Sequence, residues 1–237
     1  VQLRSLTNDW TILLLAGPKA RDVLGRAARG DWSKAAFPWL SVREGFVGIA
    51  PAVIMAVSYS GEDALEIHVP NAHLLSAYRA LRAAGDPMGL RLFGARAVET
   101  MRMEKGYLHW KSELLTEFDP FETGLSRFVQ TNKPDFIGKA ALETRQAEGL
   151  RRKLVLLEIA ATDRPAFGGA SVMRGDRVVG TVTAGDWGHR TGLNLAFAFV
   201  DAAEAGQGGL EVDLIGDRFS VTVLDAAPYD PDDGLVR

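Results

Sequence analysis

Hydrophobic and polar positions in the first 150 residues alternate between strand and helix patterns. An apolar run over Trp10–Ala16 predicts a buried strand that ends at Gly17 and Pro18. Apolar residues then recur at helical spacing over Lys19–Arg29, up to Gly30. The same argument predicts strands within Leu40–Val57 and over Ala64–Val69, and helices over Asn71–Ala84 with Asn71 as its cap, Gly94–Lys105 and Gly138–Gly149. This part of the chain is therefore expected to be an α/β unit.

From Arg151 onward the pattern changes to short β-rich runs separated by Gly, Pro and Asp turns. Such spacing is typical of a barrel or a sandwich. The predicted runs are Lys153–Ile159, Gly169–Met173, Arg177–Thr183, Leu195–Val200 and Leu210–Leu224. We therefore expect an α+β protein with two domains, residues 1–149 and residues 150–237.

Composition narrows the class of protein. The 237 residues are 47% hydrophobic and 24% charged, which are globular values. No apolar run approaches the roughly 20 residues of a membrane helix. The 27 basic and 30 acidic residues argue against a dedicated nucleic-acid binder. The absence of cysteine excludes disulfides, thiolate zinc sites and cysteine nucleophiles. It fits a reducing cytosol or matrix, and we expect a cytoplasmic location.

Common catalytic templates are missing from the sequence. It contains neither GxGxxG nor GxxxxGK[ST], and no GxSxG elbow. Its four histidines, which are His68, His73, His109 and His189, form no HExxH. We therefore expect no metal site.

The segment from Met101 to Trp110 carries the strongest candidate chemistry. Glu104 lies at the end of the predicted helix, between two methionines and an aromatic pair. A carboxylate at a helix C-terminus meets the negative end of the macrodipole and requires a compensating partner. One interpretation is a solvated Glu104 that pairs with Arg102 or Lys105. The other is a carboxylate that faces a ligand in an apolar, aromatic wall.

Two further segments admit a functional and a plain interpretation. Ser58–Glu62 places Tyr59 and Glu62 on a tight turn, which is also what an ordinary hairpin requires. Phe118–Leu125 is a loop that leads into Phe128, and loop-and-core packing explains it equally well.

Taken together, these segments resemble a known family. The matching blocks, in chain order, are Leu15–Leu24, Ser58–Glu66, Arg102–Tyr107, Pro120–Leu125, Asp135–Lys139, Gly180–Gly185 and the closing Ala227–Pro231. They resemble the folate-binding aminomethyltransferase family of the glycine cleavage T-protein. The resemblance is closest to the C-terminal folate domains of dimethylglycine and sarcosine dehydrogenases, and it covers nearly the whole chain.

The resemblance implies an aminomethyltransferase-like α/β folate-binding core followed by a C-terminal β-barrel of jelly-roll character. It also implies that Glu104 holds the pterin ring of tetrahydrofolate, because a carboxylate can accept both the amino group and the neighbouring ring N–H. The binding set implied with it is Tyr59, Tyr107 and Trp110 for stacking, Glu62 on the turn, and Lys133 near the folate tail.

Departures from the family pattern limit what the resemblance assigns. Ala64 and Leu65 replace the usual residues after the turn, and Ser60 stands where relatives have Thr. The family's catalytic aspartate belongs to a segment before the first matching block, so no catalytic residue is assigned here. Asp9 is the only acidic residue ahead of the first helix, and its surroundings are typical of a strand lead-in. We expect the chain to be a piece of a longer polypeptide.

The implied function is tetrahydrofolate-dependent one-carbon transfer that forms 5,10-methylenetetrahydrofolate. Its partners would be a small amine or methyl donor and a flavin dehydrogenase domain upstream in the same polypeptide. Two alternatives stay open at this point. One is a non-catalytic, folate-binding regulatory protein, and the other is a folate-dependent demethylase that acts on oxygen- or sulfur-bound methyl groups.

Overall fold

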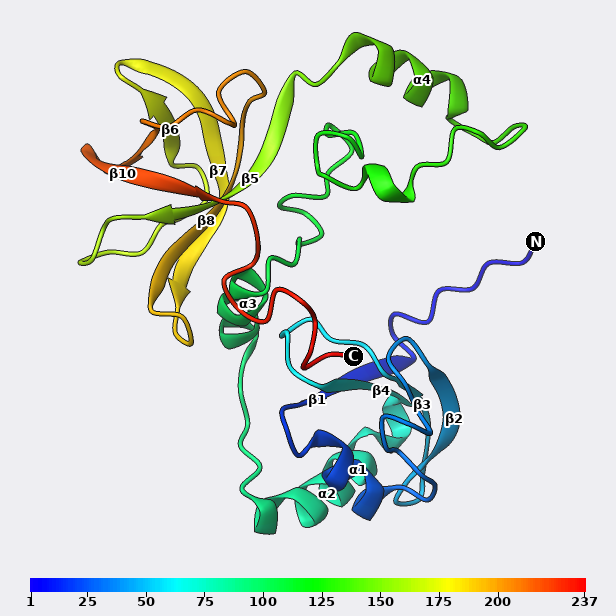
Figure 1. Cartoon of the computed structure of the whole chain (residues 1–237). Helices are drawn as coiled ribbons and strands as arrows, with labels where there is room; N and C mark the ends of the chain where they lie inside the picture. The colour runs from blue at the N-terminus through cyan, green and yellow to red at the C-terminus, as the bar shows by residue number, and fades with distance from the viewer. The chain divides into compact units, whose positions relative to one another are not determined.

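The computed structural model describes residues 1–237, and the chain separates into two compact units (Figure 1). The first unit consists of Val1–Glu99 together with Asp230–Arg237, and the second of Thr100–Tyr229. The predicted domain boundary near Gly149 lies inside the second unit, just before its first barrel strand. That boundary stays a prediction about where the family domains divide.

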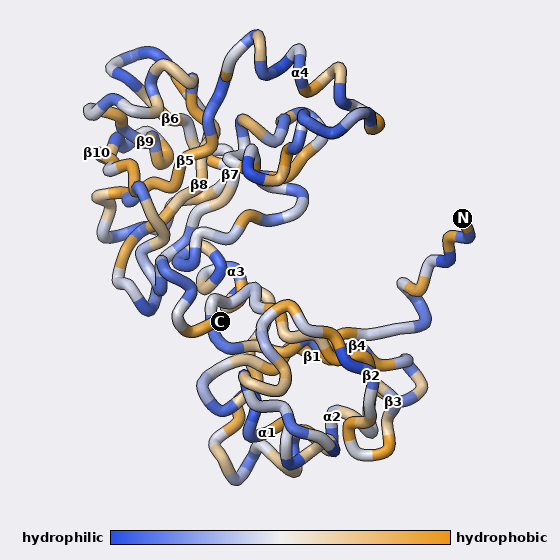
Figure 2. The backbone as a smooth tube through the Cα atoms, turned by 45° about the vertical axis from the view of Figure 1, so that its right-hand side comes forward, coloured by the Kyte–Doolittle hydropathy of each residue, from blue (hydrophilic) through white to orange (hydrophobic).

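A four-stranded antiparallel sheet forms the centre of the first unit. Its spatial order is β1-β4-β3-β2, so β1 and β2 are the edge strands. The strands are β1 (Trp10–Ala16), β2 (Val42–Val47), β3 (Ala50–Met55) and β4 (Ala64–Pro70). The apolar run over β1 is confirmed as a strand, which pairs along its whole length with β4. In Figure 2 the tube is mostly orange along β1.

Two helices cover one face of this sheet. They are α1 (Ala20–Ala27) and α2 (Leu74–Gly85), and α1 contributes Val23 and Leu24 to the core. Alternate residues of β3 and β4, such as Ile54 and Ile67, point into the same core, because neighbouring residues of a strand face opposite sides. The apolar residues that recur with the helical period of 3.6 and those that recur with the strand period of 2 therefore pack together in one core.

The predicted helix cap at Asn71 is wrong. A short 3-10 turn over Asn71–His73 precedes α2, and the Asn71 side chain makes no capping bond. Its amide instead donates to the carbonyl of Asn8 at 2.7 Å and accepts a bond from the Thr11 hydroxyl. The Asn71 side chain therefore connects the segment before α2 to the start of β1.

The second unit contains a closed, antiparallel, six-stranded barrel, as predicted for the C-terminal part. The strands follow the order β10-β5-β8-β7-β6-β9 around it. They are β5 (Arg152–Ile159), β6 (Ser171–Arg174), β7 (Arg177–Gly188), β8 (Leu193–Asp201), β9 (Glu211–Leu214) and β10 (Asp217–Leu224). The predicted run Leu210–Leu224 is in fact two strands, because Ile215 and Gly216 both adopt positive φ and turn the chain.

Residues of β8 are buried on both faces, which explains its unbroken apolar sequence. Ala196, Ala198 and Val200 face the barrel core. Leu195 and Phe197 face outward and pack with Met103. Met103 belongs to helix α3 (Ala95–Glu104), so the last turn of α3 lies against the outer surface of the barrel.

Helix α4 (Lys139–Glu148) precedes the barrel and has no buried residue. The sequence predicted this helix over Gly138–Gly149, and the two glycines flank it, each with positive φ. No helix of the structure combines the length and the apolar character that a membrane span requires.

Candidate functional site

Glu104 is the last residue of α3, and its side chain is completely buried. One carboxylate oxygen, Oε1, accepts the backbone N–H groups of Arg190 at 2.7 Å and Thr191 at 2.8 Å. The Thr191 hydroxyl lies 3.2 Å from the same oxygen. The other oxygen, Oε2, accepts the Nε–H of Arg190 at 2.6 Å. Every one of these donors comes from the turn between β7 and β8.

The turn between β7 and β8 is shaped to receive this carboxylate. Gly188 has no side chain, and a Cβ there would lie 2.9 Å from Cγ of Glu104 and 3.0 Å from Oε1. The turn is closed by the N–H of Gly192, which donates to the carbonyl of Gly188 at 2.7 Å. The missing Cβ therefore lets the backbone N–H groups of the next residues approach the carboxylate directly.

The Arg190 side chain completes the site. Its Nη2 donates to the carbonyl of Met101 at 2.7 Å, and its guanidinium lies 3.7 Å from the ring centroid of Tyr229. The positive charge offsets the helix C-terminus at which Glu104 lies. The expectation of a solvated Glu104 paired with Arg102 or Lys105 is therefore wrong, since its ionic partner is Arg190, 86 residues away.

A second buried ion pair fixes the segment after α3. Arg102 donates to Glu113 Oε2 at 3.1 Å and to the Tyr107 carbonyl at 3.0 Å. Glu113 also accepts the N–H of His109 and the hydroxyl of Thr183, both at 2.7 Å. These bonds tie the loop over residues 107–113 to α3 on one side and to β7 on the other.

Of the other predicted binding residues in the second unit, none shares a hydrogen bond with the Glu104 carboxylate. Tyr107 is half-buried, and Lys105 Nζ lies 5.9 Å from the centroid of its ring. Trp110 is 72% exposed, a high value for so large an apolar side chain. Lys133 is exposed on the loop before α4, with its Nζ 5.9 Å from the ring of Phe136.

Tyr59 and Glu62 lie in the first unit, on the turn that joins β3 to β4. The turn is closed by the N–H of Gly61, which donates to the Ser58 hydroxyl at 3.1 Å. Arg21 of α1 holds its far end through an ion pair with Asp63 at 2.8 Å. The predicted turn therefore lies within the connection over residues 56–63 that joins the two strands.

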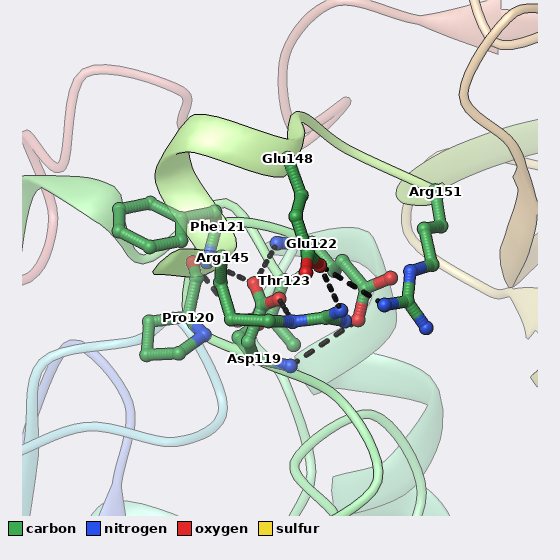
Figure 3. A network of polar contacts seen from close by, with 8 residues as sticks. All are labelled: Asp119, Pro120, Phe121, Glu122, Thr123, Arg145, Glu148 and Arg151. Atoms are coloured by element: carbon green, nitrogen blue, oxygen red, sulfur yellow. Dashed lines mark hydrogen bonds and ion pairs between the residues drawn. The ribbon is translucent and has the colours of Figure 1, made fainter. Parts of the chain in front are cut away.

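The loop that contains Pro120–Leu125 is held by a polar network (Figure 3). The Asp119 carboxylate accepts the N–H groups of Phe121 and Glu122, both at 2.9 Å, and the Nε–H of Arg145 at 3.0 Å. Hydrogen bonds from Arg151 and Arg145 hold the pKa of Glu148 below its ordinary value. The network joins the loop, α4 and the start of β5, so the plain interpretation of this motif, as loop packing, has a clear basis.

Sequence reasoning missed the residues that contact Glu104. No motif marks the turn over residues 188–192, although it places an arginine in a glycine-bounded turn between two β-rich runs. Tyr229 lies in the closing block, but the sequence assigned it no role. A basic residue in such a turn could have been predicted to pair with a carboxylate. Only the fold shows that this carboxylate is Glu104.

A four-stranded sheet with helices on one face, followed by a closed barrel against α3, defines the fold class. The sequence of the chain matches two family models. Residues 1–133 match the GCVT N-terminal domain, and residues 152–230 match the glycine cleavage T-protein C-terminal barrel domain. The chain belongs to the glycine cleavage T-protein family, and the predicted resemblance is confirmed.

Individual relatives agree with this assignment. Mitochondrial dimethylglycine dehydrogenase of Mus musculus is 35% identical over 227 residues, which are 94% of this chain and 26% of the relative. Mitochondrial sarcosine dehydrogenase of Mus musculus is 33% identical over 248 residues, which cover 100% of this chain and 27% of the relative. The aminomethyltransferase of Caldanaerobacter subterraneus subsp. tengcongensis is 31% identical over 215 residues, which cover 91% of this chain and 57% of the relative. The chain thus spans about a quarter of the dehydrogenases and just over half of the aminomethyltransferase.

A solved structure shares the fold. The glycine cleavage system aminomethyltransferase T from Bartonella henselae superposes with a TM-score of 0.68, covering 92% of this chain and 83% of that one, at 17% sequence identity. The predicted fold class, a mixed α and β core followed by a barrel, is confirmed.

Proposed function

We propose that this chain is the tetrahydrofolate-binding, one-carbon transfer part of its protein, with 5,10-methylenetetrahydrofolate as the product. Membership of the T-protein family supports the reaction class. The observation that carries the ligand assignment is the fully buried Glu104 carboxylate. Backbone N–H groups hold it in a turn where Gly188 has no side chain to block their approach.

The chemistry of this site fits a pterin edge. A buried carboxylate is stable only when it is paired and hydrogen-bonded, and the two backbone N–H groups hold the Glu104 side chain in one orientation. An amino group beside a ring N–H is a neutral donor pair that such a group binds well in a site shielded from water. When bound, tetrahydrofolate supplies the nitrogen atoms that accept the one-carbon unit.

The chain's own residues would then contribute positioning. Glu104 would fix the orientation of the ring, and the barrel against which α3 packs would hold Glu104 still. Holding two reactants in the right geometry is a large source of rate enhancement. Tyr107, Trp110 and Lys133 are the other ligand contacts that we propose in this unit. We also propose Tyr59 and Glu62 of the first unit as ligand contacts, and single substitutions of each test this role independently.

Partners follow from the relatives. We propose a flavin dehydrogenase domain in the same polypeptide, because the chain is similar over 94% of its length to one part of dimethylglycine dehydrogenase. That domain would convert a small methylated amine into the one-carbon donor.

Calorimetric titration of folinic acid into the wild type and Glu104→Gln tests the assignment. Loss of a charge-assisted hydrogen bond costs about 2 kcal/mol, or roughly 30-fold in affinity. The matched control is Glu143→Gln, an exposed carboxylate on α4, which should bind as the wild type does. Equal affinities in all three proteins would overturn the role of Glu104.

A further inference from the structure

In the structure the Glu104 site is occupied by the chain itself. The guanidinium of Arg190 uses two acceptors at once, Oε2 of Glu104 at 2.6 Å and the Met101 carbonyl at 2.7 Å. Its carbon lies 3.7 Å from the ring centroid of Tyr229. The site therefore holds a planar group with adjacent N–H donors, with an aromatic ring close to it.

The pterin edge of a folate has the same chemistry. Its amino-bearing carbon and the two flanking nitrogens form a cyclic guanidine, which presents an amino group and a ring N–H side by side. Arg190 thus uses the kind of acceptors and the aromatic neighbour that such an edge requires. We propose that Arg190 is an internal stand-in for the pterin, and that folate binding displaces its guanidinium. This inference rests on the proposed function and deepens it.

The two oxygens of Glu104 have different roles in this proposal. A carboxylate oxygen has about two lone-pair positions, and those of Oε1 are taken by the backbone N–H groups of Arg190 and Thr191. These bonds do not depend on the Arg190 side chain. Oε2 has the guanidinium as its hydrogen-bond partner. Withdrawal of the side chain thus opens Oε2 and the Met101 carbonyl, while the carboxylate stays in place.

This proposal implies a different mode of recognition from a pterin edge bound by both oxygens of Glu104. A ligand that used both oxygens of Glu104 would compete with the turn that holds the carboxylate. A donor pair that replaces Arg190 would instead use Oε2 together with the Met101 carbonyl, with Tyr229 as its stacking partner. Tyr229 thereby becomes a specificity residue for flat, cyclic guanidine-like ligands.

In this proposal the Arg190 guanidinium competes with folate for the site, and this competition lowers the affinity for folate. If the closed form with Arg190 bound is populated to about nine-tenths or more, the apparent affinity for folate falls about tenfold or more. Removal of the side chain should therefore tighten binding, whereas removal of a purely structural arginine leaves binding unchanged or weakens it.

The experiment is calorimetric titration of folinic acid into the 237-residue chain and its variants. Arg190→Met, which keeps the length and loses the donors, should bind about tenfold more tightly than the wild type. Tyr229→Leu should bind more weakly, and Glu104→Gln in the Arg190→Met background should lose the gain. The matched control is Arg218→Met, a barrel arginine paired with Asp176, which should leave affinity unchanged.

The outcomes separate the two proposals. If Glu104→Gln loses affinity but Arg190→Met binds no more tightly than the wild type, the stand-in is overturned and the proposed function stands. If neither the wild type nor a folded Arg190→Met binds folinic acid, both fall.

A second measurement covers the case in which Arg190→Met does not fold. In ¹⁵N NMR spectra of the wild type, the Arg190 Nε–H signal, assigned with Arg190→Lys, should shift on addition of folinic acid as its bond to Oε2 breaks. The Arg218 signal serves as the internal control. A signal that stays unchanged at saturation would overturn the displacement.

Discussion

The guanidinium of Arg102 and the carboxylate of Glu113 form a 3.1 Å ion pair in which neither side chain reaches solvent. Arg102 lies on the last turn of α3, and Glu113 lies in the loop that follows it. The pair anchors this loop beside the Glu104 site, and Thr183 of β7 completes it with a 2.7 Å bond to Glu113. The arrangement links the stability of the barrel to the geometry of the candidate site.

Glu113→Gln should destabilise the protein by about 3–5 kcal/mol, because it removes the negative charge that faces the buried Arg102 guanidinium. Urea unfolding followed by tryptophan fluorescence measures this. The control Glu143→Gln removes an exposed i,i+4 partner of Lys139 and should cost less than about 1 kcal/mol. Similar losses in both variants would contradict the role of the buried pair.

Gly188→Ala should destabilise the barrel unit by about 1–3 kcal/mol, since the added Cβ meets Thr191 Oγ1 at 2.5 Å and Glu104 Cγ at 2.9 Å. The same variant should weaken folinic acid binding, because the carboxylate must move. Gly206→Ala, at a position with open space around the added Cβ, is the matched control. Thermal melts and calorimetry on both variants check the prediction, and a Gly188→Ala protein as stable as Gly206→Ala would refute it.

Asp63→Asn should loosen the turn that carries Tyr59 and Glu62. Asp63 accepts the Nε–H of Arg21 at 2.8 Å, and both side chains are largely buried. Hydrogen bonds to charged groups contribute about 1.5–3 kcal/mol, so a loss in this range is expected in urea unfolding. Asp9→Asn, which breaks an exposed pair with Arg4, should change stability by less than about 1 kcal/mol. Equal effects of the two substitutions would show that the Arg21 contact does not hold the turn.

Stability should fall in acid partly through Glu204. Burial raises the pKa of this carboxyl, but hydrogen bonds from Arg177 and Arg174 outweigh it and hold the pKa below its ordinary value of 4.5. A depressed pKa means that the folded state binds the proton less readily than the unfolded state. The contribution is therefore complete above pH 4.5 and is lost as the pH falls through the folded-state pKa.

Urea midpoints of the wild type and Glu204→Gln, measured between pH 7 and pH 3, check this. The two proteins should differ most at pH 7 and converge in acid. A difference that stays constant over the whole range would show that the carboxylate's charge plays no part.

Most elements were predictable from local pattern. The apolar run of β1 and the helical spacing of α2 reflect burial on one or both faces, and burial leaves its period in the sequence. Prediction failed where a tertiary contact overrode a local preference. Asn71 has the side chain of a cap, but its amide bonds to Asn8 and Thr11 instead. Pairing with β8 extends β7 to Gly188, well beyond the predicted end at Thr183.

The candidate site divides in the same way. Sequence alone singled out Glu104, through its place at a helix end and its family motif, and it correctly implied that the carboxylate requires a compensating partner. It could not name that partner. Arg190 is 86 residues away, and no periodicity relates a helix terminus to a hairpin turn across a barrel.

By itself, the sequence determined the succession of an α/β part and a β-barrel and the family, and it singled out Glu104 as the candidate carboxylate, because each of these depends on short-range pattern and motif. Only the tertiary structure decided what surrounds that carboxylate: the cut-away at Gly188, the guanidinium of Arg190 and the ring of Tyr229. The physical reason is that a buried charge is satisfied by whichever donors the closed barrel brings within about 3 Å, and that selection depends on chain topology rather than on neighbouring residues.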